Sequence, residues 1–316
     1  MIRLLTWTLL GLLLVCLVVA AYLFVPALPD PTSGFLPRTG EVRRAQVTRQ
    51  WTSDTASFSE ITLTSSSGLQ AELSVSRPRA GGGRRPLVIL MGGYVTGRRA
   101  VELIRNPHGI VIAAINYPYH GPKATREIAS LRYVGQVRQA ILDTPPVVLL
   151  SLDYLAQQDY VDPARIELAG VSFGAFLASV PGALDTRFRR VWLIHGGGDP
   201  AAVFDYQLED TITSGPLRWL ASRALALLIE APYLKPERWV GRIAPRPVIV
   251  VHARNDPSYP PASIEALDRA LRQPYQIIWL GQEHVGVRAQ ELIQQITDLL
   301  YEHIAKEAPE PSQGSR

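Results

Sequence analysis

A pentapeptide near the middle of the chain joins a nucleophile to two glycines that could expose it. An apolar stretch from Ile166 ends at Gly170-Val-Ser172-Phe-Gly174, and small residues follow it. Gly-x-Ser-x-Gly between a strand and a helix is typical of a nucleophile elbow, because its glycines let the two elements approach closely around a strained serine. We therefore predict that the Ser172 hydroxyl projects above a strand end and attacks a carbonyl carbon. The alternative is a serine turn with a structural role only.

Two later loops could supply the base and the acid that a serine nucleophile needs. Asp256 follows an apolar run at 247–251, and His284 follows a second run at 275–280. One helix and one strand fit between Asp256 and His284, so we expect the two side chains at adjacent strand ends, in the order Ser, acid, His. Taken singly, Asp256 could instead cap a helix and His284 could be a surface histidine.

An oxyanion formed by this serine would need two backbone N–H donors. The residue after the nucleophile, Phe173, is the first predicted donor. The loop Met91-Gly92-Gly93-Tyr94 follows an earlier strand, and its glycines would let the main chain approach a substrate. Tyr94 N–H is our predicted second donor, with Gly93 as the alternative.

Other polar residues near predicted strand ends are weaker candidates. His195-Gly-Gly-Gly198 spells an oxyanion motif, but it follows the strand after the elbow, and Asp199 is an alternative acid. His120 is expected to shape a tight turn and His252 to pack at a strand end. The chain contains no HExxH, EF-hand loop or GxxxxGK[ST], so we predict neither a metal nor another cofactor.

The elements that must position these residues alternate between strands and helices. Short, nearly continuous apolar runs, which are typical of strands covered on both faces, lie at 86–91, 109–115, 191–194 and 247–251. Helical stretches fall between them, for example at 147–158 and 261–271. The alternating run 69–76 predicts a strand near a sheet edge, paired with a strand around 61–63. The predicted fold class is a doubly wound α/β fold with a mostly parallel sheet and helices on both faces.

Composition excludes several classes of protein. The chain has 316 residues, of which 47% are hydrophobic and 19% charged, which fits neither a disordered protein nor a multi-pass membrane protein. A net charge of +4 without blocks of like charge gives no reason to expect a nucleic-acid partner. The single cysteine, Cys16, excludes a disulfide within the chain.

The N-terminus is predicted to associate with a membrane. Leu4–Val25 carries no charge and, as a helix, would span about 33 Å, enough for a hydrocarbon core. We predict an anchor or signal segment over 1–28, with an uncleaved anchor favoured over cleavage after Ala27. The folded domain would then lie outside the cytoplasm, or be secreted after cleavage. The predicted division continues with a linker over 29–50, an α/β domain over 51–305 and a disordered tail over 306–316.

These motifs resemble the α/β-hydrolase superfamily, and within it the dienelactone hydrolase and acetyl xylan esterase-like branch. The resemblance covers about residues 55–305 and rests on LxVxRP at 73–78, MGGY at 91–94, NYPYHG at 116–121, LDYLAQQDYVDPARIELAGVSFGA at 152–175, HARNDPSYPP at 252–261 and LGQEH at 280–284. It implies Ser172 as nucleophile, Asp256 as acid and His284 as base. The chain departs from the pattern at Met91-Gly92, where many members have His-Gly. It also has a serine where dienelactone hydrolases themselves use cysteine.

The predicted function is a serine hydrolase that cleaves small-molecule carboxylic esters through an acyl-enzyme. A prolyl oligopeptidase-like peptidase or an acyltransferase could use the same fold, and a non-catalytic binding protein is a further alternative. Residues 201–233 could be either a small cap over the substrate pocket or a core helix. The acyl length and the oligomeric state stay open.

Overall fold

The computed structural model describes residues 30–121 and 131–306, together with Gly11. The predicted anchor over 1–28 lies outside the described residues apart from Gly11, and so does the predicted tail beyond Lys306. Within the described ranges, no helix is both long enough and apolar enough to cross a membrane.

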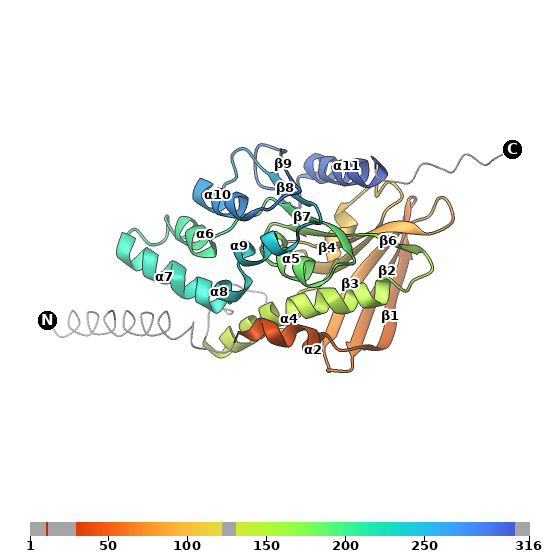
Figure 1. Cartoon of the computed structure of the whole chain (residues 1–316), viewed down its shortest axis with the longest axis horizontal. Helices are drawn as coiled ribbons and strands as arrows, with labels where there is room; N and C mark the ends of the chain where they lie inside the picture. The colour runs from red at the N-terminus through yellow and green to blue at the C-terminus, as the bar shows by residue number, and fades with distance from the viewer. Residues whose placement is uncertain (1–10, 12–29, 122–130, 307–316) are drawn as a thin grey trace.

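One sheet of nine strands runs through the described part of the chain (Figure 1). The strands are β1 (Val42–Thr52), β2 (Ala56–Ser65), β3 (Gln70–Pro78), β4 (Arg85–Met91), β5 (Val111–Ile115), β6 (Val161–Val171), β7 (Phe188–Ile194), β8 (Val248–His252) and β9 (Tyr275–Trp279). Their order is β1-β2-β3-β5-β4-β6-β7-β8-β9. The first three strands and β5 pair antiparallel, whereas all pairs from β5 to β9 are parallel. The mostly parallel sheet of the sequence prediction is therefore confirmed.

Each central strand sends alternate side chains into two separate hydrophobic cores. In β4, Leu87, Ile89 and Met91 belong to one core, and Val88 and Leu90 belong to the other. The strands β7 and β8 alternate between the same two cores. Because neither face of these strands meets water, both sets of positions are apolar, and the strands read in the sequence as continuous hydrophobic runs.

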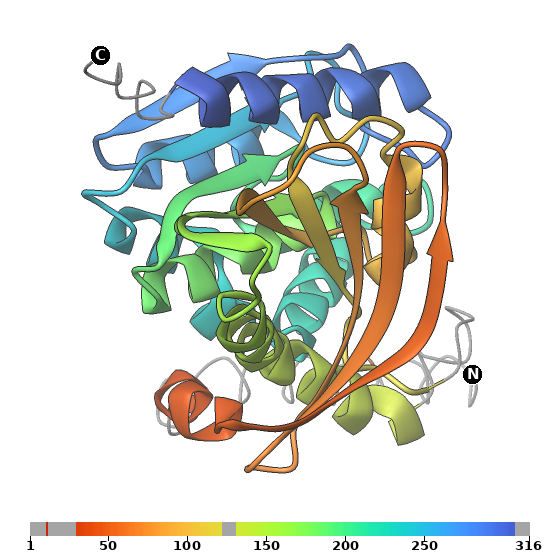
Figure 2. The same cartoon turned by 90° about the vertical axis from the view of Figure 1, so that its right-hand side faces the viewer.

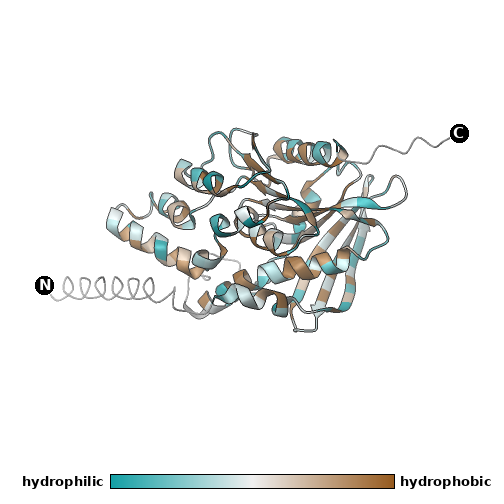
Figure 3. Cartoon of the chain, in the orientation of Figure 1, coloured by the Kyte–Doolittle hydropathy of each residue, from teal (hydrophilic) through white to brown (hydrophobic). Residues whose placement is uncertain are grey.

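Helices form a layer on each face of the sheet (Figure 2). One face carries α2 (Phe35–Thr39), α4 (Leu131–Leu155), α5 (Phe173–Leu184) and α10 (Pro261–Ala270), and the other carries α11 (Gln290–Lys306) and the short helix η3 (Gly97–Leu103). Hydrophobic residues gather on the central strands and on the helix sides that face them (Figure 3). This two-sided covering confirms the layer arrangement expected for the fold class.

The segment predicted as a linker over 29–50 is folded, which corrects that prediction. The short helix η2 (Pro31–Gly34) and α2 lead directly into β1. The side chains of β1 are almost all exposed, and the strand is held by antiparallel backbone pairing with β2. The Arg38 guanidinium also binds the Asp143 carboxylate of α4 at 2.8 Å. Because backbone pairing rather than burial holds β1, its sequence lacks the apolar periodicity that would reveal a strand.

Two other elements differ from their predicted positions. The strand predicted at 69–76 is β3, which lies inside the sheet because β1 and β2 extend it beyond the expected edge. The helix predicted at 147–158 is the C-terminal part of α4, which begins at Leu131. Pro145 and Pro146 lie inside α4, and adjacent prolines normally indicate a helix boundary.

Residues 201–233 form helices that pack mainly on other helices. They comprise most of α6 (Pro200–Gln207), α7 (Gly215–Leu228) and the start of α8 (Ala231–Leu234). The principal contacts of α7 are with α6, α8 and α4, and Leu217 and Trp219 on α7 are exposed. Figure 1 places α6 and α7 at the opposite end of the molecule from β1 and β2. The alternative of a core helix covering the sheet is therefore wrong for α7.

Candidate active site

Ser172 occupies a sharp corner between β6 and α5. Its backbone has φ 57° and ψ −118°, a conformation that a residue with a side chain rarely adopts. The two glycines of the pentapeptide permit this corner. A Cβ at Gly174 would collide with the Met91 carbonyl group of β4, and a Cβ at Gly170 would lie 2.5 Å from the Gly174 carbonyl oxygen. The strand, serine and helix therefore stand as the sequence predicted.

Because the obstacle at Gly174 is backbone, a side chain there should be costly. We expect Gly174→Ala to destabilise the protein by about 1–3 kcal/mol and to lower its Tm by roughly 5 °C. Gly135→Ala is the matched control, because Gly135 lies in α4 with no atom within 4 Å of the added Cβ. That control should leave Tm unchanged or raise it slightly. Equal Tm values for the two variants, measured by thermal unfolding, would contradict the close approach of α5 to β4.

The structure brings the three predicted side chains together in one chain of hydrogen bonds. The His284 Nε2 atom lies 2.8 Å from Ser172 Oγ, and His284 Nδ1 lies 2.8 Å from Asp256 Oδ2. The other Asp256 oxygen accepts a hydrogen bond from Ser258 N–H at 2.8 Å. With Asp256 as acceptor, Nδ1 carries the proton and Nε2 is free to accept the proton of the Ser172 hydroxyl.

Neighbouring loops hold the acid and the histidine in register. Asp256 lies in the loop after β8, and His284 lies in the loop after the adjacent strand β9. Two backbone hydrogen bonds join these loops, from Arg254 N–H to the Gly281 carbonyl and from Asn255 N–H to the Gln282 carbonyl. The Asp256 carboxylate is buried, whereas the His284 ring, which contacts Ser172, is partly exposed to solvent.

His195 braces the loop that carries His284, a role that sequence reasoning missed. Its Nε2 atom bonds the Leu280 carbonyl at 3.1 Å, and its Nδ1 accepts a hydrogen bond from Val285 N–H at 2.9 Å. His195 thus contacts the chain on both sides of His284. Burial lowers the pKa of His195 to about 4, which keeps the ring neutral near pH 7. A histidine at the end of the strand beside the elbow was the only available signal.

This buried histidine should make stability depend on pH. Unfolding returns the pKa of His195 from about 4 to its ordinary value near 6.5, so the unfolded state takes up a proton that the folded state refuses. The contribution of His195 to the free energy of unfolding is complete above pH 6.5. It is lost as the pH falls from 6.5 through 4. At pH 4.5 the loss is about 2.5 kcal/mol.

The variant His195→Gln isolates this contribution. We expect the wild type to exceed it in stability at pH 7, and the difference to shrink by about 2 kcal/mol at pH 4.5. Urea unfolding of both proteins at the two pH values measures the effect. A difference that stays constant with pH would show that His195 does not titrate in this range.

Two tyrosines complete the surroundings of Ser172 and were also missed. The Tyr259 ring lies 5.8 Å from the His284 ring, centroid to centroid. Burial, together with the negative charge of Asp256, raises the pKa of Tyr259, so the phenol stays protonated. The Tyr117 hydroxyl donates a hydrogen bond to the Gly92 carbonyl at 2.5 Å and so fixes the loop after β4. The only sequence signal for Tyr259 was its place three residues after Asp256.

The predicted oxyanion donors lie beside Ser172. Phe173 is the first residue of α5, and the first N–H groups of a helix have no partner within the helix. In the loop after β4, the Gly93 carbonyl accepts hydrogen bonds from Thr96 N–H and Gly97 N–H. The Tyr94 ring meets the Phe173 ring edge-on, with centroids 6.3 Å apart. The assignment of Phe173 with Tyr94 or Gly93 stays a prediction.

The weaker candidates have structural partners elsewhere. Asp199 caps α6 by accepting a hydrogen bond from Ala202 N–H, and its own N–H bonds Glu237. His252 is buried at the end of β8, where its Nε2 lies 2.9 Å from Asp268, and His120 is exposed. His195, Asp256 and His284 lie close enough to share a metal ion. Each ring nitrogen of this cluster already has a hydrogen-bond partner, so we assign no metal to it.

Known structures resemble this chain in fold. An acetyl xylan esterase from a Thermoanaerobacterium species superposes with a TM-score of 0.61 at 16% identity, over 88% of this chain and 93% of that one. An acetyl xylan esterase from a Paenibacillus species gives 0.61 at 14% identity, over 87% and 92%. A 2,6-dihydroxy-pseudo-oxynicotine hydrolase gives 0.54 at 19% identity, over 78% and 68%. Neither a model of a protein family nor a curated protein sequence matches the chain. The predicted α/β-hydrolase fold is thereby confirmed.

Proposed function

We propose that this chain, which has the α/β-hydrolase fold, is a serine hydrolase that cleaves carboxylic esters. The observation that carries the proposal is the hydrogen-bonded series Ser172, His284 and Asp256 at the nucleophile elbow. A hydroxyl, a neutral imidazole and a buried carboxylate in this order form the machinery of acyl transfer.

In the first half of the reaction, Ser172 Oγ attacks the ester carbonyl carbon while His284 Nε2 takes the hydroxyl proton. The negative oxygen of the tetrahedral intermediate is stabilised by the N–H groups of Phe173 and Tyr94 or Gly93. The bond from carbon to the alcohol oxygen then breaks, and His284 gives its proton to the leaving alcohol. Asp256 holds the imidazole in the correct tautomer and stabilises its positive charge.

In the second half, water replaces the alcohol. His284 takes a proton from water, and the oxygen attacks the acyl-enzyme carbon. The bond to Ser172 Oγ breaks, Ser172 regains its proton from His284, and a carboxylic acid leaves. The names of the solved structures with this fold, acetyl xylan esterases among them, support an ester as the substrate class.

Fluorophosphonate labelling of the full chain tests the proposed nucleophile. We expect one equivalent of label on Ser172, with complete loss of p-nitrophenyl ester hydrolysis in the labelled protein. An unlabelled Ser172 in a folded protein would contradict the proposal. Hydrolysis of a proline-containing peptide, or acyl transfer to an added alcohol in preference to water, would favour the peptidase or the acyltransferase instead.

We further propose that the chain acts at a membrane, because its uncharged stretch Leu4–Val25 is long enough to span a hydrocarbon core. The full chain should then sediment with membranes and resist extraction at alkaline pH. A full-length protein found in the soluble fraction would contradict this, and loss of the first residues from the mature protein would identify a cleaved signal.

A further inference from the structure

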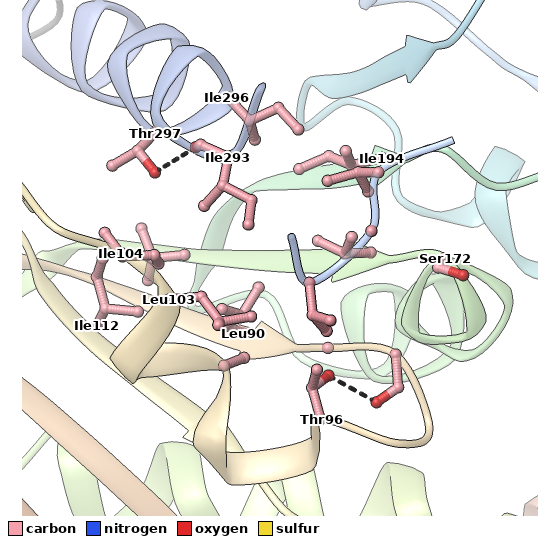
Figure 4. A pocket seen from close by; sticks show the side chains of 18 of the residues that line it. Leu90, Thr96, Leu103, Ile104, Ile112, Ser172, Ile194, Ile293, Ile296 and Thr297 are labelled. Atoms are coloured by element: carbon pink, nitrogen blue, oxygen red, sulfur yellow. Dashed lines mark hydrogen bonds between the residues drawn. The ribbon is translucent and has the colours of Figure 1, made fainter. Parts of the chain in front are cut away.

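We propose that the apolar cavity beside Ser172 binds the unbranched acyl chain of a medium-length fatty acid ester. This inference rests on the proposed function and adds the substrate class. Figure 4 shows the cavity with Ser172 near one end and Ile104, Ile112 and Thr297 at the other. Its volume is about 250 Å³.

The walls of the cavity come from the sheet face that α11 and η3 cover. Val88 and Leu90 of β4 form one side, and Ile296 and Leu300 of α11 form another. Among the described residues that line the cavity, none is an aspartate, glutamate, lysine or arginine. Such a surface attracts hydrocarbon and offers nothing to a charged or sugar-like group.

The two threonines in the wall do not alter this character. Thr297 Oγ1 donates to the Ile293 carbonyl at 2.9 Å, and Thr96 Oγ1 donates to the Gly93 carbonyl at 2.9 Å (Figure 4). Their hydroxyl protons are therefore used within the protein, and their methyl groups are left for the ligand. The other polar side chains of the lining are those of Ser172 and His284 at the reacting end, and the exposed Tyr94.

The rim of the cavity is also apolar. Tyr94 and Val95 are 65% and 77% exposed, and Val287, which also lines the cavity, is 51% exposed. Single exposed apolar side chains are common on protein surfaces and indicate nothing. Several of them gathered at one cavity indicate a binding surface. An apolar chain can therefore pass from the surface to the interior without crossing a charged residue.

The volume sets the length of the chain. Protein interiors rarely hold voids larger than a water molecule, so an open apolar space of this size is unusual for a core. An empty apolar cavity of about 150 Å³ is known to hold the six carbons of benzene, so 250 Å³ corresponds to roughly ten carbon atoms. The cavity extends along β4 from Val88 to Gly92, about 13 Å at the rise of a strand.

The closed distal end favours the acyl chain over the alcohol as the occupant. Val88, Ile112 and Leu300 are buried, whereas the exposed residues of the lining, Tyr94, Val95 and Val287, lie in the loops that follow β4 and His284. If the alcohol part of the ester occupied the cavity, the released alcohol would be trapped there by the acyl group bound to Ser172. An acyl chain in the cavity stays attached to Ser172 and leaves the outer side free for the departing alcohol and for water.

The cavity does not involve the segment expected to be a cap. Within the described chain, no residue of 201–233 contributes to its lining. The candidate acyl site is instead built from β4, β5, β7, η3 and α11. The alternative of a small cap over the substrate pocket, left open for 201–233 by the sequence, stays a prediction on which this cavity does not depend.

Plugging the distal end tests the assignment. In the wild type, kcat/KM for p-nitrophenyl esters should rise up to about fourfold per added methylene group and reach a maximum near decanoate. Thr297→Phe should lower the ratio of decanoate to acetate turnover at least tenfold. Gln295→Phe places the same ring at an exposed position of α11, so this control should keep the wild-type ratio. If Thr297→Phe fails to fold, Ile104→Ala should shift the maximum toward longer chains.

A binding measurement separates failure of this inference from failure of the proposed function. Ser172→Ala protein should gain thermal stability with decanoate but not with acetate, even if no ester is hydrolysed. Ester hydrolysis that is fastest with acetate and unchanged by Thr297→Phe would overturn the acyl site and leave the hydrolase intact. Faster turnover of decyl acetate than of ethyl decanoate would also overturn it, because the alcohol would then occupy the cavity.

Discussion

Replacing Ser172 with alanine is expected to lower kcat for ester hydrolysis by about 10⁴- to 10⁶-fold. In the proposed mechanism, the change removes the atom that forms the covalent bond to the acyl group. What remains is attack by water near the oxyanion donors, which a serine hydrolase retains at a small residual rate. No other property of the site should change, because the backbone corner at Ser172 depends on the glycines beside it.

The loss of kcat in Ser172→Ala should not add to the loss of kcat caused by removing the His284 side chain. His284 Nε2 lies 2.8 Å from Ser172 Oγ and takes its proton in the proposed mechanism, so neither group can act there without the other. We expect His284→Ala to cost a similar factor, and the double variant to be no slower than either single variant. If the two fold-losses of kcat multiplied in the double variant, Ser172 and His284 would act independently rather than as one unit.

A matched control exists on the helix that follows Ser172. Ser179 is buried in α5, and among the described residues its hydroxyl has no hydrogen-bond partner. Ser179→Ala removes a serine hydroxyl from α5 without removing an interaction, so kcat should stay at the wild-type value. A large loss in this variant would mean that changes in α5 lower activity through folding.

The sequence indicated which three side chains lie together, because chemistry limits the residue types. A nucleophile elbow needs glycines on both sides, and here the Met91 carbonyl excludes any side chain at Gly174. Asp256 and His284 could be placed because parallel strands end at a common edge, so loops after β8 and β9 must be neighbours. These constraints are local or topological, and both can be read from strand and loop patterns.

The supporting residues could not be predicted, because their roles depend on contacts distant in the sequence. His195 acts through Leu280 and Val285, and Tyr117 acts through Gly92. The sequence reveals only that such residues are polar and close to strand ends. Which loop they contact follows from the folded geometry.

The cavity was hidden for a different reason. Val88, Leu90 and Ile112 alternate along their strands as core residues normally do, and they are buried as expected. An apolar pattern indicates which side chains leave water, but it does not indicate how completely they fill the space between sheet and helix. The edge strand β1 was missed for the opposite reason. Backbone pairing holds this strand, and its sequence carries no apolar pattern that would reveal it.

Replacing Asp256 with asparagine is expected to lower kcat by about 10⁴-fold while leaving the fold intact. The Asp256 carboxylate accepts one hydrogen bond from His284 Nδ1 at 2.8 Å and another from Ser258 N–H at 2.8 Å. An amide can keep the Ser258 bond through its oxygen, but it then presents an N–H to His284. The imidazole must accept this hydrogen bond at Nδ1, which moves its own proton to Nε2. In that tautomer Nε2 can no longer take the proton of Ser172.

The loss of kcat in Asp256→Asn should come from the changed tautomer of His284 rather than from the lost negative charge alone. Asp268→Asn provides the control, because Asp268 pairs with His252 at 2.9 Å in the same domain, away from Ser172. It should cost stability at most, and leave kcat unchanged. In Asp256→Asn, the rate of fluorophosphonate labelling at Ser172 should fall together with kcat, since both reactions need Nε2 as the base. If labelling stayed fast while kcat fell, Asp256 would act in a later step, such as release of the acid, and the assigned tautomer would be wrong.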